Sequence, residues 1–144
     1  MSNTDIYDLN RFVTAQQSIY AQVVKELQNG KKVSHWIWFM FPQLQGLGYS
    51  SMAQKYAITS IDEAAAYLAH PILGQRLIEL CEILFGLEGK SAHAIFGSPD
   101  DMKLHSSLTL FSLVPNSPPI FSQLLDKYFD GKLDKNTENL LANN

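Results

Sequence analysis

Residues 8–27 read DLNRFVTAQQSIYAQVVKEL, and this stretch decides the fold class. Its apolar residues largely follow a spacing of three or four, at Leu9, Phe12, Val13, Ile19, Tyr20, Val23, Val24 and Leu27. Such spacing gathers apolar side chains into one stripe along a helix. Gly30 follows soon after, as expected for the residue that ends a helix. The stretch therefore predicts one helix over 8–27 that buries a face in a core.

The same pattern recurs along the rest of the chain. Ser60 and Glu63 match a capping box, Ser98 to Asp101 combines a cap, a proline and two acids, and Asn136 or Thr137 is expected to cap the last helix. Further helical segments are predicted over residues 51–58, 60–68, 71–85, 91–96, 98–114 and 120–129, with a final one through Leu141; those over 51–58 and 91–96 and the final one are short. With no repeat and no shift in composition, residues 1–144 are expected to form a single all-α domain, one compact array of about six to seven helices.

Composition narrows the classes of function. The 144 residues are 46% hydrophobic and 17% charged with a net charge of −3, as in a folded globular domain. A basic stripe is lacking, so nucleic acid is not an expected partner, and no apolar run reaches the roughly 18–20 residues that cross a membrane. Residues 1–5 lack the regions of a signal peptide, so a cytoplasmic location is expected. The single cysteine, Cys81, lies among leucines and is interpreted as an inert core thiol.

The segment Ser34–Gln43 (SHWIWFMFPQ) is the strongest candidate for a site. Trp36 and Trp38 offer flat walls for stacking on a ring, and His35 and Gln43 are able to orient a polar ligand. Pro42 ends the aromatic run, and because a lone strand would have no partner elsewhere in the sequence, a short helix or an irregular buried segment is favoured. The alternative is that the aromatic residues are simply bulky core anchors.

The helix predicted from Ser98 carries a second candidate. Its apolar residues spread around most of its circumference, which predicts burial on more than one side. Lys103 and Ser107 lie four residues apart on one face, where an ammonium and a hydroxyl together can hold an anion. The alternative is an exposed lysine above a serine that allows close helix packing.

Familiar signatures of catalysis and cofactor binding are absent from the sequence. It contains no P-loop, no dinucleotide fingerprint and no zinc-protease or nucleophile-elbow motif. The four histidines lie far apart, without the spacing of metal ligands. No metal and no cofactor are expected, and whether the protein is an enzyme stays open.

Several runs resemble a bacterial family of unknown function whose members are often labelled calpastatin. They are Asp8–Gln16 (DLxRFVxAQ), Ser34–Phe39 (SHWIWF), Phe41–Gln43 (FPQ), Gly46–Ser50 (GLGxS), His70–Leu77 (HPxLGxRL), Ile95–Leu104 (IFGxPDDMKL) and Leu125–Phe129 (LDKYF). The resemblance implies an all-α fold similar to that of a mycobacterial hypothetical protein, and it implies no activity. The calpastatin label conflicts with the apolar periodicity, because that inhibitor is a disordered chain.

Two hypotheses of function follow. In the first, a small nucleotide-like metabolite is bound or processed in a pocket lined by Trp, His and Lys, and a looser likeness of residues 54–56 (QKY) to proteins that process ADP-ribose derivatives favours this ligand class. In the second, the protein is a non-catalytic module that binds a protein partner through an aromatic helical surface. Exposure of the tryptophans distinguishes them, since a concave polar recess indicates a ligand and a convex apolar patch a partner.

Overall fold

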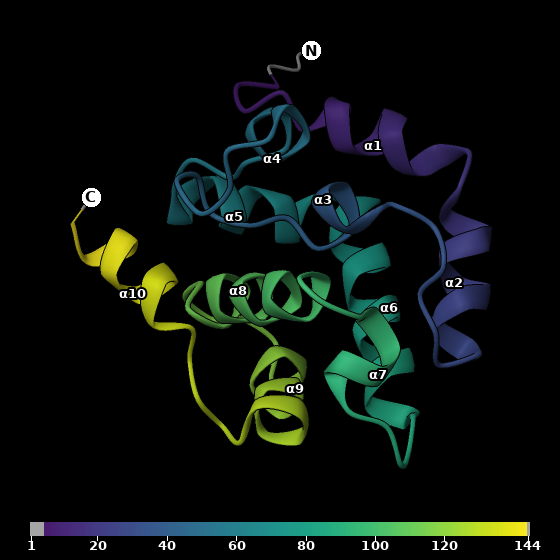
Figure 1. Cartoon of the computed structure of the whole chain (residues 1–144). Helices are drawn as coiled ribbons and strands as arrows, with labels where there is room; N and C mark the ends of the chain where they lie inside the picture. The colour runs from purple at the N-terminus through teal and green to yellow at the C-terminus, as the bar shows by residue number, and fades with distance from the viewer. Residues whose placement is uncertain (1–4, 144) are drawn as a thin grey trace.

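Ten helices make up the part of the chain that this computed structural model describes, residues 5–143 (Figure 1). They are α1 (Asn10–Gln17), α2 (Tyr20–Gln28), α3 (Ile37–Met40), α4 (Ser51–Lys55), α5 (Ile61–Ala69), α6 (Leu73–Gly86), α7 (Ala92–Phe96), α8 (Asp100–Ser112), α9 (Ile120–Phe129) and α10 (Lys135–Ala142). The described residues form no strand, only an isolated parallel bridge between Leu44 and Ile58. The all-helical prediction is confirmed, whereas the count of six to seven helices is wrong.

The helix predicted over 8–27 is in fact two helices. The chain leaves helical geometry at Ile19, where φ is −121° and ψ is −3°, and α2 begins at the next residue. Three residues before the break, the buried Gln16 occupies the position on the apolar stripe between Phe12 and Tyr20. The other helix outside the predicted ranges is the four-residue α3, in the segment predicted as a short helix or an irregular buried segment.

Helix α8 forms the centre of the fold. It contacts α3, α5, α7, α9 and α10, and in Figure 1 it crosses the middle of the molecule with α5 above it and α9 below. Every residue from Ser106 to Phe111 is buried. This agrees with the prediction that the helix is enclosed on more than one side.

Caps fix several of the helix ends. The hydroxyl of Ser60 accepts a hydrogen bond from the backbone N–H of Glu63, as predicted, but the Glu63 carboxylate accepts from Thr59 instead of from Ser60. The predicted cap of the last helix is wrong by two residues or more: Asp134 caps α10 and accepts from both the N–H and the hydroxyl of Thr137.

A buried carboxylate, that of Glu26, fastens α2 to the chain that leads into α3. Its Oε1 accepts from the N–H of Val33 (2.8 Å), the N–H of Ser34 (3.0 Å) and the indole N–H of Trp36 (2.9 Å). Its Oε2 accepts from the Ser34 hydroxyl (2.6 Å) and from the Gln22 amide (3.0 Å). Burial by itself would raise the pKa of this carboxyl, but the hydrogen bonds, first those of Ser34, outweigh burial and hold the pKa well below its ordinary value.

A second buried polar side chain holds α3 from the other side. The Gln16 amide donates to the backbone carbonyl of Phe39 (2.7 Å) and to the hydroxyl of Tyr67 (3.0 Å), and Arg76 donates to its oxygen (3.2 Å). Together, Glu26 and Gln16 fix the position of the aromatic segment.

Within residues 5–143, no helix combines the length and the apolar character that crossing a membrane requires. Residues 1–4, part of the segment in which no signal peptide is predicted, lie outside the described residues.

Replacing Glu26 with glutamine tests the buried carboxylate. Because folding lowers its pKa, Glu26 stabilises the native state at neutral pH, and this contribution is lost as the pH falls below about 5. We expect E26Q to lower the free energy of unfolding by about 2–4 kcal/mol at pH 7, and the difference from wild type to shrink toward pH 3. Urea unfolding at both pH values measures this.

The matched control is Glu88→Gln, at an exposed carboxylate, which should change the free energy of unfolding by less than about 0.5 kcal/mol at either pH. An E26Q defect of the same size at pH 7 and pH 3 would contradict the charged role of Glu26.

Candidate functional site

The aromatic segment and α8 meet at Trp38 and Lys103. The ammonium of Lys103 lies 5.2 Å from the centroid of the Trp38 ring, within the range of a cation–π contact. The two residues belong to α3 and α8, which pack against each other. The two candidate segments of the sequence are thus neighbours in space.

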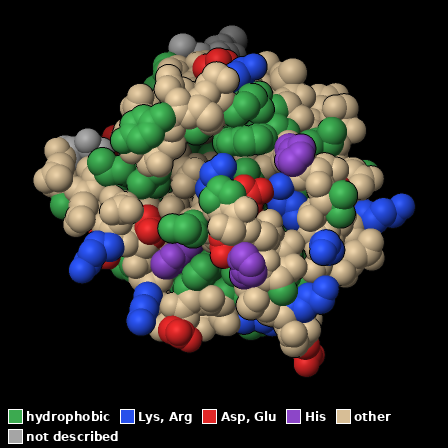
Figure 2. All heavy atoms as spheres, in the orientation of Figure 1, with side chains coloured by type: hydrophobic (Ala, Val, Ile, Leu, Met, Phe, Trp, Pro, Cys, Tyr) green, Lys and Arg blue, Asp and Glu red, His purple; other side chains and the backbone are tan. Residues whose placement is uncertain are grey.

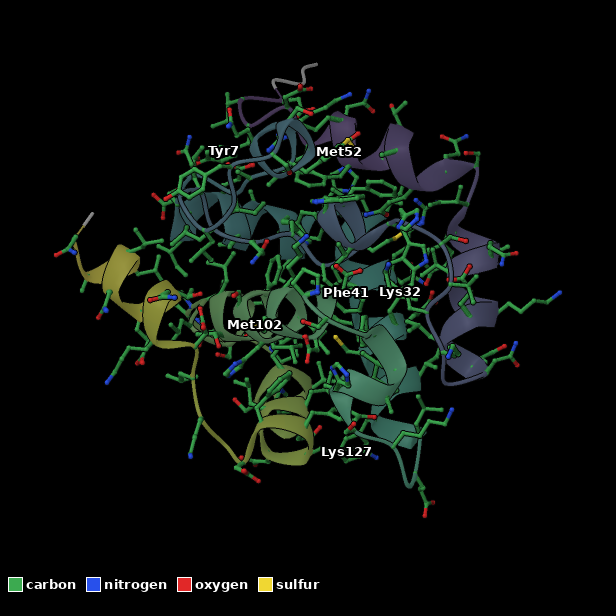
Figure 3. All side chains as sticks on the ribbon, in the orientation of Figure 1. Tyr7, Lys32, Phe41, Met52, Met102 and Lys127 are labelled. Atoms are coloured by element: carbon green, nitrogen blue, oxygen red, sulfur yellow. The ribbon has the colours of Figure 1, made fainter. Side chains whose placement is uncertain are left out.

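A charged cluster surrounds this contact. Asp100, in the first turn of α8, lies between two lysines: its Oδ2 is 2.7 Å from Nζ of Lys32, and its Oδ1 is 3.7 Å from Nζ of Lys103. Lys32 also donates to the Ser34 carbonyl and lies over the Trp36 ring at 5.0 Å. The side chain of Lys32 is only 5% exposed, whereas that of Lys103 is 25% exposed. Lys103 is therefore the accessible cation of the cluster. Figure 3 labels Lys32 and Met102, the residue that precedes Lys103 on α8.

Lys103 borders a hollow of about 230 Å³, here called the Lys103 hollow. It lies between the loop that connects α3 to α4, the first turns of α8 and the start of α10, and its lining includes Gln43, Leu47, Met102, Lys103, His105 and Asp134. Lysine, acidic and histidine side chains gather near the middle of the face drawn in Figure 2.

Two ionisable side chains of the Lys103 hollow are already engaged. The Nε2 of His105 is 2.7 Å from the Lys132 carbonyl, and its ring stacks on that of Phe129 with centroids 4.1 Å apart. The Asp134 carboxylate accepts from the hydroxyl of Ser106 as well as from its cap partners on α10. Among the described residues that line the hollow, Lys103 is the single Lys or Arg.

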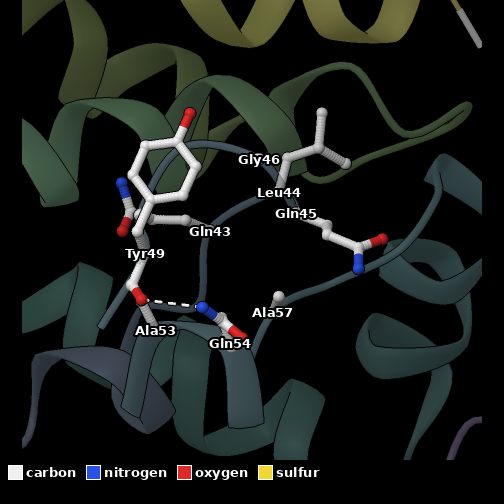
Figure 4. A pocket seen from close by; sticks show the side chains of 9 residues that line it. Gln43, Leu44, Gln45, Gly46, Tyr49, Ala53, Gln54 and Ala57 are labelled. Atoms are coloured by element: carbon white, nitrogen blue, oxygen red, sulfur yellow. Dashed lines mark hydrogen bonds between the residues drawn. The ribbon is translucent and has the colours of Figure 1, made fainter. Parts of the chain in front are cut away.

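A second hollow, of about 350 Å³, is also bordered by the loop that connects α3 to α4 (Figure 4). We call it the glutamine hollow, because its lining includes Gln43, Gln45, Tyr49, Ala53, Gln54 and Ala57. The Gln54 amide donates to the Tyr49 carbonyl at 2.7 Å, the bond drawn in Figure 4. Gln43 and Gly48 border both hollows.

Glycines and one backbone bridge give the loop between the hollows its shape. Gly46 has a φ of +103°, which other residues rarely adopt. A Cβ on Gly48 would stand 2.8 Å from the Cβ of Ala53, so the loop approaches α4 too closely for any side chain there. Gln45 N–H donates to the carbonyl of Ile58, and Ile58 N–H donates to the carbonyl of Gln43. These bonds hold the wall shared by the two hollows.

The six predicted site residues separate into two groups. Lys103 and Gln43 line one hollow together, and the half-buried Trp38 lies beneath Lys103. Trp36, by contrast, is completely buried with its indole N–H bonded to Glu26, so the predicted stacking of a ligand between the two tryptophans is wrong.

Ser107 and His35 also lie outside the two hollows. Ser107 is completely buried, so it does not form the predicted anion site with Lys103. His35 is exposed and is absent from the lining of either hollow.

Trp38 and Ser107 share one unusual property. The indole Nε1 of Trp38 and the hydroxyl of Ser107 are buried, and neither finds a hydrogen-bond partner in the described part of the chain. A buried polar atom without a partner costs about 1–3 kcal/mol and requires an explanation. Both atoms belong to residues that the sequence pattern selected.

Tyr49 and Met102 are the residues that the sequence reasoning missed. Tyr49 is 82% exposed and Met102 is 67% exposed, and each borders a hollow. A signal for Tyr49 was present in the sequence, since it directly follows the loop glycines and precedes the QKY run of the ADP-ribose likeness. Met102 gave no comparable signal.

The geometry gives less support to chemistry at the cysteine thiol or at a metal ion. The Cys81 thiol is fully buried and burial raises its pKa, which keeps it protonated and unreactive at neutral pH. Within residues 5–143, no three His, Cys, Asp or Glu side chains gather as metal ligands would.

Comparison with known proteins gives two matches. Residues 6–141 match the family described as "Protein of unknown function (DUF1810)". The chain is also similar to the crystal structure of the conserved hypothetical protein Rv1873 from Mycobacterium tuberculosis, with a TM-score of 0.94 and 49% sequence identity over 96% of this chain and 99% of that chain. No curated protein matches. These matches confirm the family resemblance predicted from the motifs, and neither description names an activity.

Replacing Ser107 with alanine tests whether its hydroxyl has a hydrogen-bond partner in the protein. Because the hydroxyl is buried without a protein partner, we expect S107A to leave the free energy of unfolding unchanged or to raise it by about 1 kcal/mol. Urea unfolding of the variant and the wild type provides the measurement.

Thr109→Val is the control on the same helix. The Thr109 hydroxyl donates to the His105 carbonyl and accepts from the N–H of Asp134, so its loss should cost about 1–2 kcal/mol. If S107A were as destabilised as T109V, Ser107 would have a structural partner after all.

Proposed function

Since the chain belongs to the DUF1810 family of proteins of unknown function, we propose a function from the geometry of its own site: it binds a small, nucleotide-like anionic metabolite at the Lys103 hollow. The observation that supports the proposal is the environment of the Lys103 ammonium. Its ammonium is accessible, is held between Asp100 and the Trp38 ring, and borders a hollow that also presents the Gln43 amide.

Lys103 is the charged group of the hollow that keeps free donors for an anion, whereas Asp134, the acid in the same lining, already accepts from Ser106 and Thr137. Lys32 is buried and neutralised by Asp100 at 2.7 Å, whereas the same carboxylate is 3.7 Å from Lys103, beyond hydrogen-bond distance. Lys103 therefore keeps donors for a phosphate or carboxylate of a ligand. The indole beneath it restricts the directions in which the ammonium can point.

The other side chains favour a ligand with a flat or apolar part. Met102 and Leu47 supply adaptable apolar surface in the same lining as Lys103. A nucleotide combines an anionic group with a ring, and the likeness of residues 54–56 to proteins that process ADP-ribose derivatives is in keeping with this class. The proposal places the protein in the cytoplasm, as expected from its sequence, and covers binding, with any chemical step left open.

A second candidate function is docking of a protein partner. It is favoured by the exposure of Tyr49 and Met102, two large apolar side chains that border the hollows. The tryptophans do not contribute to such a surface, because Trp36 is buried and Trp38 lies under Lys103. Tyr49 and Met102 would then be needed for complex formation, while no metabolite would stabilise the protein.

Ligand binding is tested by thermal shift and by isothermal titration calorimetry with phosphate, AMP and ADP-ribose. A ligand that binds only the native state raises the melting temperature, and Lys103→Ala should weaken its binding about 10–100-fold, since a hydrogen bond to a charged group contributes about 1.5–3 kcal/mol. Binding should also change the fluorescence of Trp38, which lies against Lys103.

Lys31→Ala is the matched control, because Lys31 is an exposed lysine that borders neither hollow. It should bind as tightly as wild type. The proposal would be overturned if none of the compounds stabilised the protein, or if K103A bound them with unchanged affinity.

A further inference from the structure

We infer that the ligand spans both hollows, with its anionic group at Lys103 and a neutral, hydroxyl-bearing ring in the glutamine hollow, as in a phosphorylated sugar or nucleoside. This inference rests on the proposed function, because it takes the anion at Lys103 as its starting point. It assigns a separate subsite and a chemical class to the second half of the ligand.

The sizes of the two hollows favour a ligand that uses both of them. The Lys103 hollow holds about 230 Å³, below the roughly 300 Å³ at which small-molecule pockets begin. The glutamine hollow holds about 350 Å³, and Gln43 and Gly48 border both. Because the two hollows share Gln43 and Gly48, a ligand too large for the Lys103 hollow gains further contacts if it extends past the Gln43 side chain into the glutamine hollow.

The lining of the glutamine hollow indicates which chemical group it would hold. Its polar side chains are three carboxamides and a phenol, from Gln43, Gln45, Gln54 and Tyr49, and none of the described residues that line it carries a formal charge. Carboxamides donate and accept hydrogen bonds, as hydroxyl groups do, but they leave a buried charge uncompensated. The chemistry of this hollow therefore fits a neutral ring rich in hydroxyl groups.

The hydrogen bond between Gln54 and Tyr49 orients the amide group of Gln54 at the subsite. The Gln54 nitrogen donates to the backbone carbonyl of Tyr49 at 2.7 Å, which orients the amide and leaves its oxygen as an acceptor (Figure 4). A hydroxyl of the ligand would donate to this oxygen. Leu44, Ala53 and Ala57 supply the apolar part of the lining, against which the carbon face of a sugar ring can pack.

The shape of the subsite is set before any ligand arrives. The loop is bonded to Ile58 on both sides of Leu44, and the close approach of Gly48 to Ala53 fixes its distance from α4. A preformed wall lowers the entropy lost on binding.

The test uses three probes: inorganic phosphate, ribose and ribose 5-phosphate, measured by calorimetry on the full chain. We expect ribose 5-phosphate to bind at least 10-fold more tightly than phosphate, and ribose alone to bind more weakly than either. Ala57→Leu places a larger side chain in the glutamine hollow, so it should reduce the affinity for ribose 5-phosphate to that for phosphate while phosphate binding stays unchanged. Ala94→Leu, at an exposed alanine outside both hollows, should leave both affinities as in wild type.

Gln54→Leu is the second variant and decides the question if Ala57→Leu unfolds. It removes the acceptor oxygen with little change in size and should lower the affinity for ribose 5-phosphate but not that for phosphate. If both ligands bind in a Lys103-dependent way and neither variant changes their affinity ratio, the inference is overturned and the proposed function stands. If neither phosphate nor ribose 5-phosphate binds through Lys103, the proposed function and the inference both fail.

Discussion

The buried carboxylate of Glu26 is the interaction on which the arrangement of the site depends. A charge at 3% exposure is tolerated because five donors surround it, four of them from the segment that leads into α3. Those donors cannot be satisfied in another arrangement without leaving the charge desolvated and unpaired, which is far more costly than losing one neutral hydrogen bond. The segment 33–36 therefore has one acceptable path across the end of α2.

This path determines where the second tryptophan and its lysine meet. Because Trp36 is anchored to Glu26, and Gln16 bonds the carbonyl of Phe39, the short α3 is fixed at both ends. Trp38 lies between these two anchors and faces α8 at Lys103. Pro42 and the loop glycines then turn the chain so that Gln43 borders both hollows. A polar interaction within the core thus positions groups at the surface.

The sequence predicted the helical class and most of the helix starts, because apolar periodicity and capping residues act locally. It also selected Lys103, Gln43 and Trp38. It could not assign Glu26 and Gln16, since a polar residue on an apolar stripe has no recognisable role until its distant partners are known. Hollows such as the one beside Gln54 arise from loop geometry and have no periodic pattern to reveal them.

The two tryptophans illustrate how similar residues acquire different roles. Each lies beneath a lysine, and one carboxylate, that of Asp100, serves both lysines. The Lys32 side chain is 5% exposed and bonded to Ser34 and Asp100, and the buried Trp36 is bonded to Glu26, so this pair stabilises the fold. In the Lys103–Trp38 pair the lysine retains exposure and its ion pair with Asp100 is long, at 3.7 Å. An accessible charged group without a partner at hydrogen-bond distance can still bind a ligand, and this difference favours the second pair over the first as the candidate site.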